Sequence, residues 1–213
     1  MYDSEKREKL IHHFAAMTGG FFGGYTIVNH CDIFGNAQTA NMIKMVKDLL
    51  YGDFAVLPFL LLCFLVYVAG NIFSVVSRRL IHADPKIVSF FVTAAAIVII
   101  GISPAVSNDY LALAPIFFAA PVQWNAFSFA AGYTSSTIFS SNNLRIATTS
   151  LTSYIMTKNK AELDKAKFYW TTLLFFHIGV ALSCIVSIYL SVAGIWFAFI
   201  PLILTVFVYC YRT

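Results

Sequence analysis

The sequence predicts an all-α integral membrane protein with six transmembrane helices and two short half-helices, arranged as two three-span repeats of inverted topology. Three observations support this prediction. The chain is 59% hydrophobic and only 11% charged, whereas a soluble domain carries about 25% charged residues. It contains several apolar stretches long enough to cross a bilayer. A polar segment in its first half also recurs in its second half.

Six apolar stretches are candidates for crossing about 30 Å of hydrocarbon. The first and fourth are interrupted by Gly, Asn or Gln, and the other four are cleaner. The six cover roughly residues 11–29, 54–77, 87–104, 110–131, 168–191 and 193–211. Two further segments, 37–51 and 142–157, are amphipathic and too polar to span. We therefore expect each of these two to enter the protein as a half-helix.

The two halves of the chain match each other at a nearly constant separation. The aligned pairs are Tyr25 with Phe127 and Asn41 with Asn143, 102 residues apart, and Gly70 with Gly179, 109 residues apart. A duplicated polar segment inside an apolar chain is typical of transporters whose site lies at a repeat interface. We divide the chain into a cytoplasmic N-terminal segment, a first repeat and a second repeat, with bounds 1–10, 11–104 and 105–213.

The basic residues favour one orientation in the membrane. If the N-terminus is cytoplasmic, twelve of the fourteen Lys and Arg residues lie on the cytoplasmic side, and only Lys44 and Lys47 lie outside. Cytoplasmic loops carry such an excess, so we expect both termini in the cytoplasm. Because each repeat has an odd number of spans, the second must run upside down relative to the first. Segment 37–51 then enters from outside and segment 142–157 from the cytoplasm.

Several function classes are disfavoured by the sequence. The net charge of +4 follows from membrane topology, so nucleic acid is not expected as a partner. The four cysteines form no CxxC pair and have no His at ligand spacing, so neither a metal nor a cofactor is expected. Motifs of hydrolases, zinc proteases and nucleotide-binding enzymes are absent, so we do not expect an enzyme. No carboxylate lies clearly within a span, which disfavours a simple carboxylate proton relay.

The candidate substrate site consists of polar residues near the starts of the two half-helices. Asn, Ser and Thr are N-cap residues, and a helix N-terminus favours an anionic or acceptor-rich ligand. We expect Gln38, Asn41, Asn125 and Asn143 to converge on one cavity with Trp124 at its wall. The complete expected set is Tyr25, Gln38, Thr39, Asn41, Gln123, Trp124, Asn125, Phe127, Asn142, Asn143 and Arg145. Interhelical hydrogen bonding is the alternative role for the amides, and an interfacial basic anchor is an equal alternative for Arg145.

Two motifs in this sequence resemble the paired signatures of YoaK-like bacterial membrane proteins. The first runs through Gly19-Gly20 and Tyr25-Thr26 to Phe34-x-Asn36-Ala37-Gln38-Thr39-Ala40-Asn41. The second runs through Gln123-Trp124-Asn125-Ala126-Phe127 to Ser141-Asn142-Asn143-Leu144-Arg145. The resemblance covers nearly the whole chain. It implies a six-span protein of the bacterial inner membrane, in a family largely of unknown function that is suspected to transport small molecules.

The chain departs from the family pattern at several positions. The acidic residue often found two positions before the tyrosine is Gly23 here. The glycine of the Thr-Gly-Asn motif is Ala40 in the first copy and Asn142 in the second, and the second threonine is Ser141. If the acidic residue handles a coupling proton or cation, this chain lacks that function or uses another group.

The leading function is a transporter or facilitator of a small polar metabolite, including an anionic one, that works by alternating access between the two repeats. A passive channel is the second reading, because inverted repeats and half-helices also build pores. A non-transporting membrane scaffold or partner subunit is the third. The expected partners are a small-molecule substrate and the lipid bilayer, and a homodimer is left open. The expected location is the cytoplasmic membrane, which the chain crosses several times.

Overall fold

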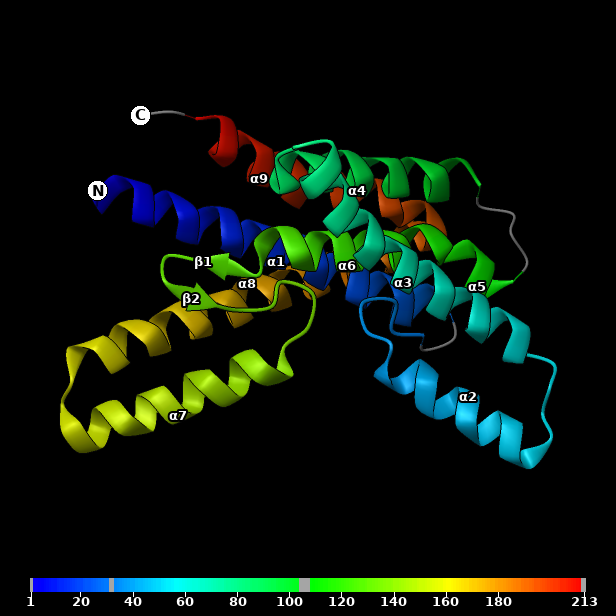
Figure 1. The fold of residues 1–213 in the computed structure, drawn as a ribbon, viewed down its shortest axis with the longest axis horizontal. Helices are drawn as coiled ribbons and strands as arrows, with labels where there is room; N and C mark the ends of the chain where they lie inside the picture. Colours follow the sequence, from blue (N-terminus) through cyan, green and yellow to red (C-terminus); the bar gives the residue numbers. More distant parts are fainter. Residues whose placement is uncertain (1, 31–32, 104–107, 212–213) are drawn as a thin grey trace.

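The computed structural model describes residues 2–30, 33–103 and 108–211, and it is almost entirely helical (Figure 1). The all-α class predicted from the sequence is therefore confirmed, with one short hairpin added. In order, the elements are α1 Tyr2–Asn29, α2 Thr39–Tyr51, α3 Leu57–Leu80, α4 Pro85–Ile102, α5 Asp109–Ala112, α6 Ala114–Phe127, β1 Phe129–Ala130, β2 Tyr133–Thr134, α7 Ser141–Thr157, α8 Lys160–Leu190, the 3-10 helix η1 Ser191–Ala198 and α9 Phe199–Cys210.

Three helical stretches in the described part of the chain are long and apolar enough to cross a membrane. They are Leu57–Leu80, Pro85–Ile102 and the continuous stretch Lys160–Cys210. The third comprises α8, η1 and α9, and its backbone turns at Ser191, where φ is 49°. These stretches contain most of four of the six predicted spans. The other two predicted spans, 11–29 and 110–131, lie in α1 and in the segment from α5 to β1. Neither is among the three stretches that are long and apolar enough to cross a membrane.

The helices pack in pairs that recur between the two halves of the chain. In the first set of pairs, α1 packs along α8, α7 packs on α8, and α1 contacts α9. In the second set, α6 packs along α3, α2 packs on α3, and α6 contacts α4. The corresponding helices in the two halves are α1 and α6, α2 and α7, α3 and α8, and α4 and α9. Replacing each helix by its counterpart turns one set of pairs into the other. The largest apolar core lies where the sets meet, around Phe21, Tyr25, Ile97, Phe117 and Ile195.

Two aligned glycines lie at close contacts between helices. Gly179 on α8 faces the backbone of α1, where a Cβ would overlap the carbonyl oxygen of Met17. Gly70 on α3 faces the backbone of α6, where a Cβ would lie 2.5 Å from the carbonyl oxygen of Phe118. Small residues let membrane helices approach closely. The glycine pair matched in the sequence therefore occupies matching places in the helix packing.

The beginning of α1 lies beside the end of α9 (Figure 1). The Arg7 side chain donates from Nε to the Val208 carbonyl oxygen at 3.1 Å, and its Nη2 donates to the Tyr209 carbonyl oxygen. Basic side chains commonly bind the last carbonyls of a helix in this way. This contact places the beginning of α1 and the end of α9 at the same end of the bundle, which is compatible with the predicted location of both termini on one side of the membrane.

The half-helices α2 and α7 project from the bundle toward its opposite ends (Figure 1). Their predicted ranges, 37–51 and 142–157, differ from the observed ones by no more than two residues at either end. The outer face of α2 exposes Met42, Ile43, Val46, Leu49 and Leu50. This apolar face agrees with the amphipathic pattern that distinguished the segment from a span.

The loop between α3 and α4 is held to α9 by one side-chain hydrogen bond. The Tyr209 hydroxyl donates to Asp84 Oδ2 at 2.7 Å, and Asp84 Oδ1 accepts from the backbone N–H of Lys86 at 2.8 Å. Burial raises the pKa of Asp84, but the hydrogen bonds from Tyr209 and from the N–H groups of Lys86 and Ile87 outweigh it and hold the pKa below its ordinary value.

We expect Tyr209→Phe to lower the free energy of unfolding at neutral pH. The loss should be about 1 kcal/mol or less, because the Tyr209–Asp84 pair is exposed. Because the folded pKa of Asp84 is depressed, its contribution is present above the pKa of the unfolded chain and is lost as pH falls through the folded value. Thermal unfolding from pH 7 to about pH 3 should therefore show the two proteins converging in acid. In an Asp84→Asn background, which keeps an N-cap residue, Tyr209→Phe should have no pH-dependent effect. An equal difference at every pH would contradict this assignment.

Candidate functional site

The segments that lead into the two half-helices touch each other inside the protein. Nδ2 of Asn36, which is fully buried, donates to the Gly19 carbonyl oxygen at 2.7 Å and to the Ile138 carbonyl oxygen at 2.9 Å. Asn36 and Ile138 are 102 residues apart, which is the separation that aligns the two polar segments. Each segment therefore contacts the other at an aligned position.

A second buried amide ties α6 to the same region. Gln123 Nε2 donates to the Ala15 carbonyl oxygen on α1 at 2.9 Å and to Thr137 Oγ1 at 3.3 Å. A Cβ on Gly19 would overlap the Thr137 carbonyl oxygen, so α1 and this segment are in direct backbone contact. Gln123 thus makes interhelical hydrogen bonds, the alternative role considered for the amides.

Asn143, near the start of α7, is occupied by its own loop. Its Oδ1 accepts from Ser135 Oγ at 3.0 Å and from the Ser136 N–H at 3.3 Å, and its Nδ2 donates to the Ser136 carbonyl oxygen at 2.7 Å. His12 Nε2 lies 3.0 Å from Ser135 Oγ and extends the network to α1. Asn143 therefore holds the loop against the half-helix, and the structure leaves little of its hydrogen-bonding capacity for a ligand.

The start of α2 differs from the start of α7 in this respect. Asn41 Nδ2 donates to Gln38 Oε1 at 3.4 Å, a long bond. Gln38 Nε2 and Asn36 Oδ1 are buried and have no partner in the described part of the chain. An unsatisfied buried polar group costs roughly 1–3 kcal/mol. The first copy therefore offers a donor and an acceptor that a bound polar molecule could satisfy.

Neither half-helix has the side-chain cap that the sequence suggested. The N-cap residues are Gln38 for α2 and Ser140 for α7, and neither side chain caps the helix. By contrast, Asp84 and Asn159 cap α4 and α8 through their side chains. The capping expectation was wrong because Asn41 and Asn143 lie inside the first turn of their helices rather than ahead of it. The first N–H groups of α2 and α7 have no side-chain acceptor among the residues that the structure describes.

Three expected aromatic residues lie in separate places. Trp124 is half-buried, and its ring contacts Phe139 edge-on at 4.8 Å between centroids, next to the Asn36–Ile138 contact. Phe127 contacts Phe90 at 5.9 Å and lies in an apolar cluster. Tyr25 donates its hydroxyl to the Val192 carbonyl oxygen at 3.0 Å. Of the three, Trp124 is the one that contacts the segment leading into α7.

Tyr25 also lines a cavity of about 210 Å³ that sequence reasoning did not anticipate. His30 and Asp109 share this cavity, with His30 Nδ1 2.8 Å from Asp109 Oδ1. The two residues are 79 positions apart in the sequence. No sequence signal linked them.

The remaining expected residues are exposed. Arg145 Nη2 donates to Asn142 Oδ1 at 2.9 Å on the outer face of α7, and Thr39 is exposed at the start of α2. Asn125, on α6, donates to Asn71 Oδ1 at 3.0 Å and to the Pro121 carbonyl oxygen at 2.8 Å. Asn125 lines a different cavity, between α3 and α6.

The expected convergence of four amides on one cavity is not observed. Gln38 and Asn41 lie together, Asn143 is bound to its own loop, and Asn125 faces α3. The prediction was wrong because Asn125 lies on the α3 side of α6, whereas Gln123, two residues earlier, faces α1. Sequence reasoning also left Asn36 out of the site, although Asn36 makes the hydrogen bond that joins the two aligned segments.

No curated protein and no solved structure matches the chain. A family model described as "Protein of unknown function (DUF1275)" matches residues 11–208. This match extends over almost the whole chain and agrees with the YoaK-like resemblance of the two motifs. The chain therefore belongs to the DUF1275 family, whose function is unknown.

Proposed function

We propose that this chain is a transporter or facilitator of a small polar metabolite in the cytoplasmic membrane, built from two inverted three-span repeats with the substrate site at the start of α2. The observation that carries the proposal is the contact between Asn36 and Ile138. Under two-fold symmetry a position touches its own counterpart where the axis passes. A pseudo-two-fold axis that passes close to Asn36 and Ile138 would explain why these two aligned positions are in contact.

The helix packing supports the same axis. The two sets of helix pairs exchange under it, and so do the contacts of Gly70 with α6 and Gly179 with α1. Inverted repeats of this kind place the substrate site at the interface between repeats, near the bilayer midplane, with half-helix N-termini facing the substrate. Rocking of one repeat against the other would then expose the site to each side in turn.

The chemistry at the start of α2 favours a ligand rich in acceptor atoms. The uncapped N–H groups and the positive end of the helix dipole attract a carboxylate, phosphate or carbonyl oxygen. Gln38 Nε2 is a further buried donor without a partner among the described residues. Gln123 and Asn143 hold the surrounding segments in place.

A thermal-shift screen on the purified protein, followed by flux into proteoliposomes, tests this function. We expect a small polar compound to raise the unfolding midpoint, because a ligand that binds only the folded state stabilises it. The same compound should then show saturable flux. Non-saturable flux would indicate a passive channel. If no compound shifts the midpoint or crosses the membrane, the proposal is contradicted in favour of a scaffold.

Alanine substitutions should separate the ligand-binding amides from the structural one. We expect Gln38→Ala and Asn41→Ala to weaken binding of the screened compound roughly five- to a hundredfold, since a lost hydrogen bond costs about 1–3 kcal/mol. Asn143→Ala should instead lower the unfolding midpoint of the unliganded protein, because it removes the side-chain partner of the Ser136 N–H and carbonyl groups and one of the two partners of the Ser135 hydroxyl. Isothermal titration and thermal unfolding measure the two effects. Normal ligand affinity in both Gln38→Ala and Asn41→Ala would remove the site from the start of α2.

A further inference from the structure

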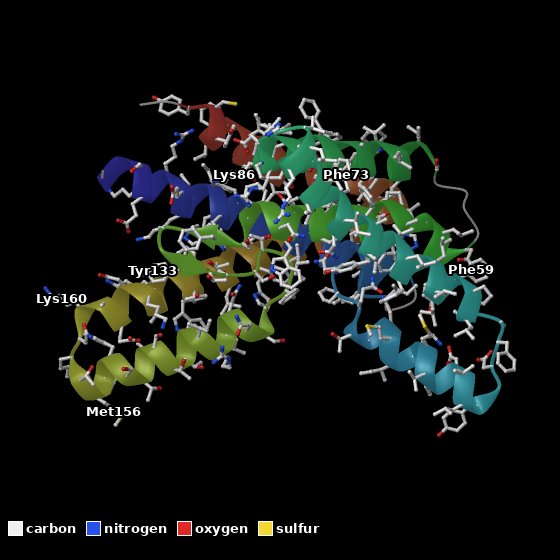
Figure 2. All side chains as sticks on the ribbon, in the orientation of Figure 1. Phe59, Phe73, Lys86, Tyr133, Met156 and Lys160 are labelled. Atoms are coloured by element: carbon white, nitrogen blue, oxygen red, sulfur yellow. The ribbon has the colours of Figure 1, made fainter. Side chains whose placement is uncertain are left out.

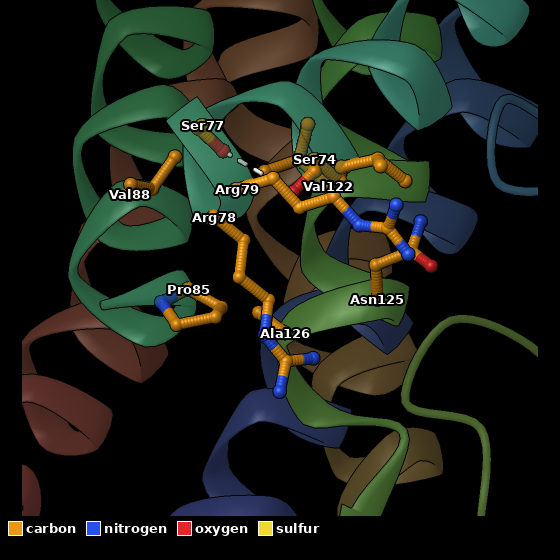
Figure 3. Close-up of a pocket in the computed structure, with 10 residues that line it drawn as sticks. Ser74, Ser77, Arg78, Arg79, Pro85, Val88, Val122, Asn125 and Ala126 are labelled. Atoms are coloured by element: carbon orange, nitrogen blue, oxygen red, sulfur yellow. Dashed lines mark hydrogen bonds between the residues drawn. The ribbon is translucent and has the colours of Figure 1, made fainter. Parts of the chain in front are cut away.

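A cavity of about 510 Å³ opens between α3, the first turn of α4 and the second half of α6 (Figure 3). Its volume lies in the range of small-molecule sites. Two neighbouring arginines from the last turn of α3 dominate it: Arg79 reaches toward Asn125 and Arg78 toward Ala126 (Figure 3). The polar or helix-starting residues of its lining are Ser74, Ser77, Arg78, Arg79, Pro85 and Asn125.

The charge of this cavity is not neutralised within the described part of the chain. None of its described lining residues is acidic. Neither Arg78 nor Arg79 makes an ion pair with any described residue. Asp84, the nearest acidic residue along the chain, is occupied by Tyr209 and by the Lys86 N–H. Two guanidinium groups therefore face one cavity with their donors available.

The polar wall around the arginines is fixed by its own hydrogen bonds. Asn125 on α6 is tied to Asn71 on α3 at 3.0 Å. The hydroxyl of Ser77, which is buried, donates to the Ser74 carbonyl oxygen at 3.3 Å. The arginine donors are thus the part of the lining that a ligand would engage. A guanidinium presents a planar fork that matches the oxygens of phosphate or carboxylate.

We propose that this cavity binds a phosphate-bearing anion through Arg78 and Arg79, either the headgroup of an anionic lipid or a free phosphate compound. Under the orientation given by the basic residues, it opens at the cytoplasmic face, where basic pockets between membrane helices hold lipid headgroups. The positive-inside bias explains basic residues at this end of α3. It does not explain why both arginines share a ligand-sized cavity with no acidic residue among its described lining residues. This site is separate from the start of α2 and does not depend on transport.

Binding of two probes to the purified protein in a neutral detergent tests the site. The probes are inorganic phosphate and dioleoyl phosphatidic acid, measured by titration calorimetry and by native mass spectrometry, respectively. We expect at least one probe to bind, and Arg78→Gln with Arg79→Gln to weaken it at least tenfold, which is about 1.4 kcal/mol. The charge-matched control is Lys160→Gln with Lys167→Gln. Both lysines are exposed and lie outside the cavity, so this control should bind as the wild type does.

The outcomes identify the source of the anion. Binding of phosphatidic acid alone assigns the cavity to a lipid headgroup, and binding of inorganic phosphate as well assigns it to a soluble anion. Because both arginines are exposed, the double variant should unfold at the wild-type midpoint without ligand, and this can be checked directly. The proposal is overturned if neither probe binds, or if the arginine and lysine double variants lose affinity equally. Since no flux is measured, a failed transport assay leaves this test unaffected.

Discussion

Gly179→Ala should lower the thermal unfolding midpoint of the purified protein by roughly 2–12 °C. Alanine normally stabilises a helix by about 1 kcal/mol relative to glycine, so the expected sign is opposite to helix propensity. The reason is that a Cβ at this position would overlap the Met17 carbonyl oxygen of α1, and backbone cannot move aside as a side chain can. Overpacking of this kind costs about 1–3 kcal/mol, and 1 kcal/mol corresponds to roughly 2–4 °C for a chain of this size.

The aligned glycine should respond in the same direction. Gly70→Ala places a Cβ against the Phe118 carbonyl oxygen and the Pro121 ring of α6, so we expect a loss within the same range. Ala181→Val is the matched control, because Ala181 lies on the same helix, α8, and is exposed. If either glycine variant is as stable as the wild type, the close packing of that helix pair is incorrect. Should Ala181→Val destabilise equally, the effect is not specific to the crossings.

The half-helices could be located from the sequence because their composition contrasts with their surroundings. Segments 37–51 and 142–157 carry too many polar residues to span, yet keep an apolar face, and they correspond to α2 and α7. The apolar stretches were less informative about where helices begin. α8 starts at Lys160, eight residues before the predicted span, because its charged first turns remain helical with Asn159 as a side-chain cap. Apolarity indicates where a helix meets lipid, not where it starts.

The candidate site was predicted only in part, because alignment identifies equivalent positions but not their hydrogen-bond partners. Asn41 and Asn143 align, yet Asn143 binds the loop residues Ser135 and Ser136 while Asn41 makes one long bond to Gln38. The residues aligned with the two serines are Ile33 and Phe34, which offer no side-chain hydrogen bond. The hydrogen bonds therefore differ between the two aligned segments, whereas the helix pairs around them correspond. A contact such as that of His30 with Asp109 depends on folding alone.

The inverted orientation of the two repeats is the central claim of this account, and it predicts an all-or-none difference in labelling. Asp53 follows α2 and Lys160 begins α8, and both are exposed, so access to each depends on the side of the membrane it faces. Figure 2 shows Lys160 and Met156 at one end of the molecule and Phe59, near Asp53 in the sequence, at the other end. Cysteines at 53 and 160 are therefore suitable reporters of the two sides.

The most direct measurement is labelling of intact cells with a membrane-impermeant maleimide, on a background in which Cys31, Cys63, Cys184 and Cys210 are replaced. Permeabilised cells provide the control for reactivity. The account predicts that Asp53→Cys is labelled from outside and that Lys160→Cys is labelled only after permeabilisation. Equal labelling of both positions in intact cells would contradict the inverted repeat, and with it the proposed transporter.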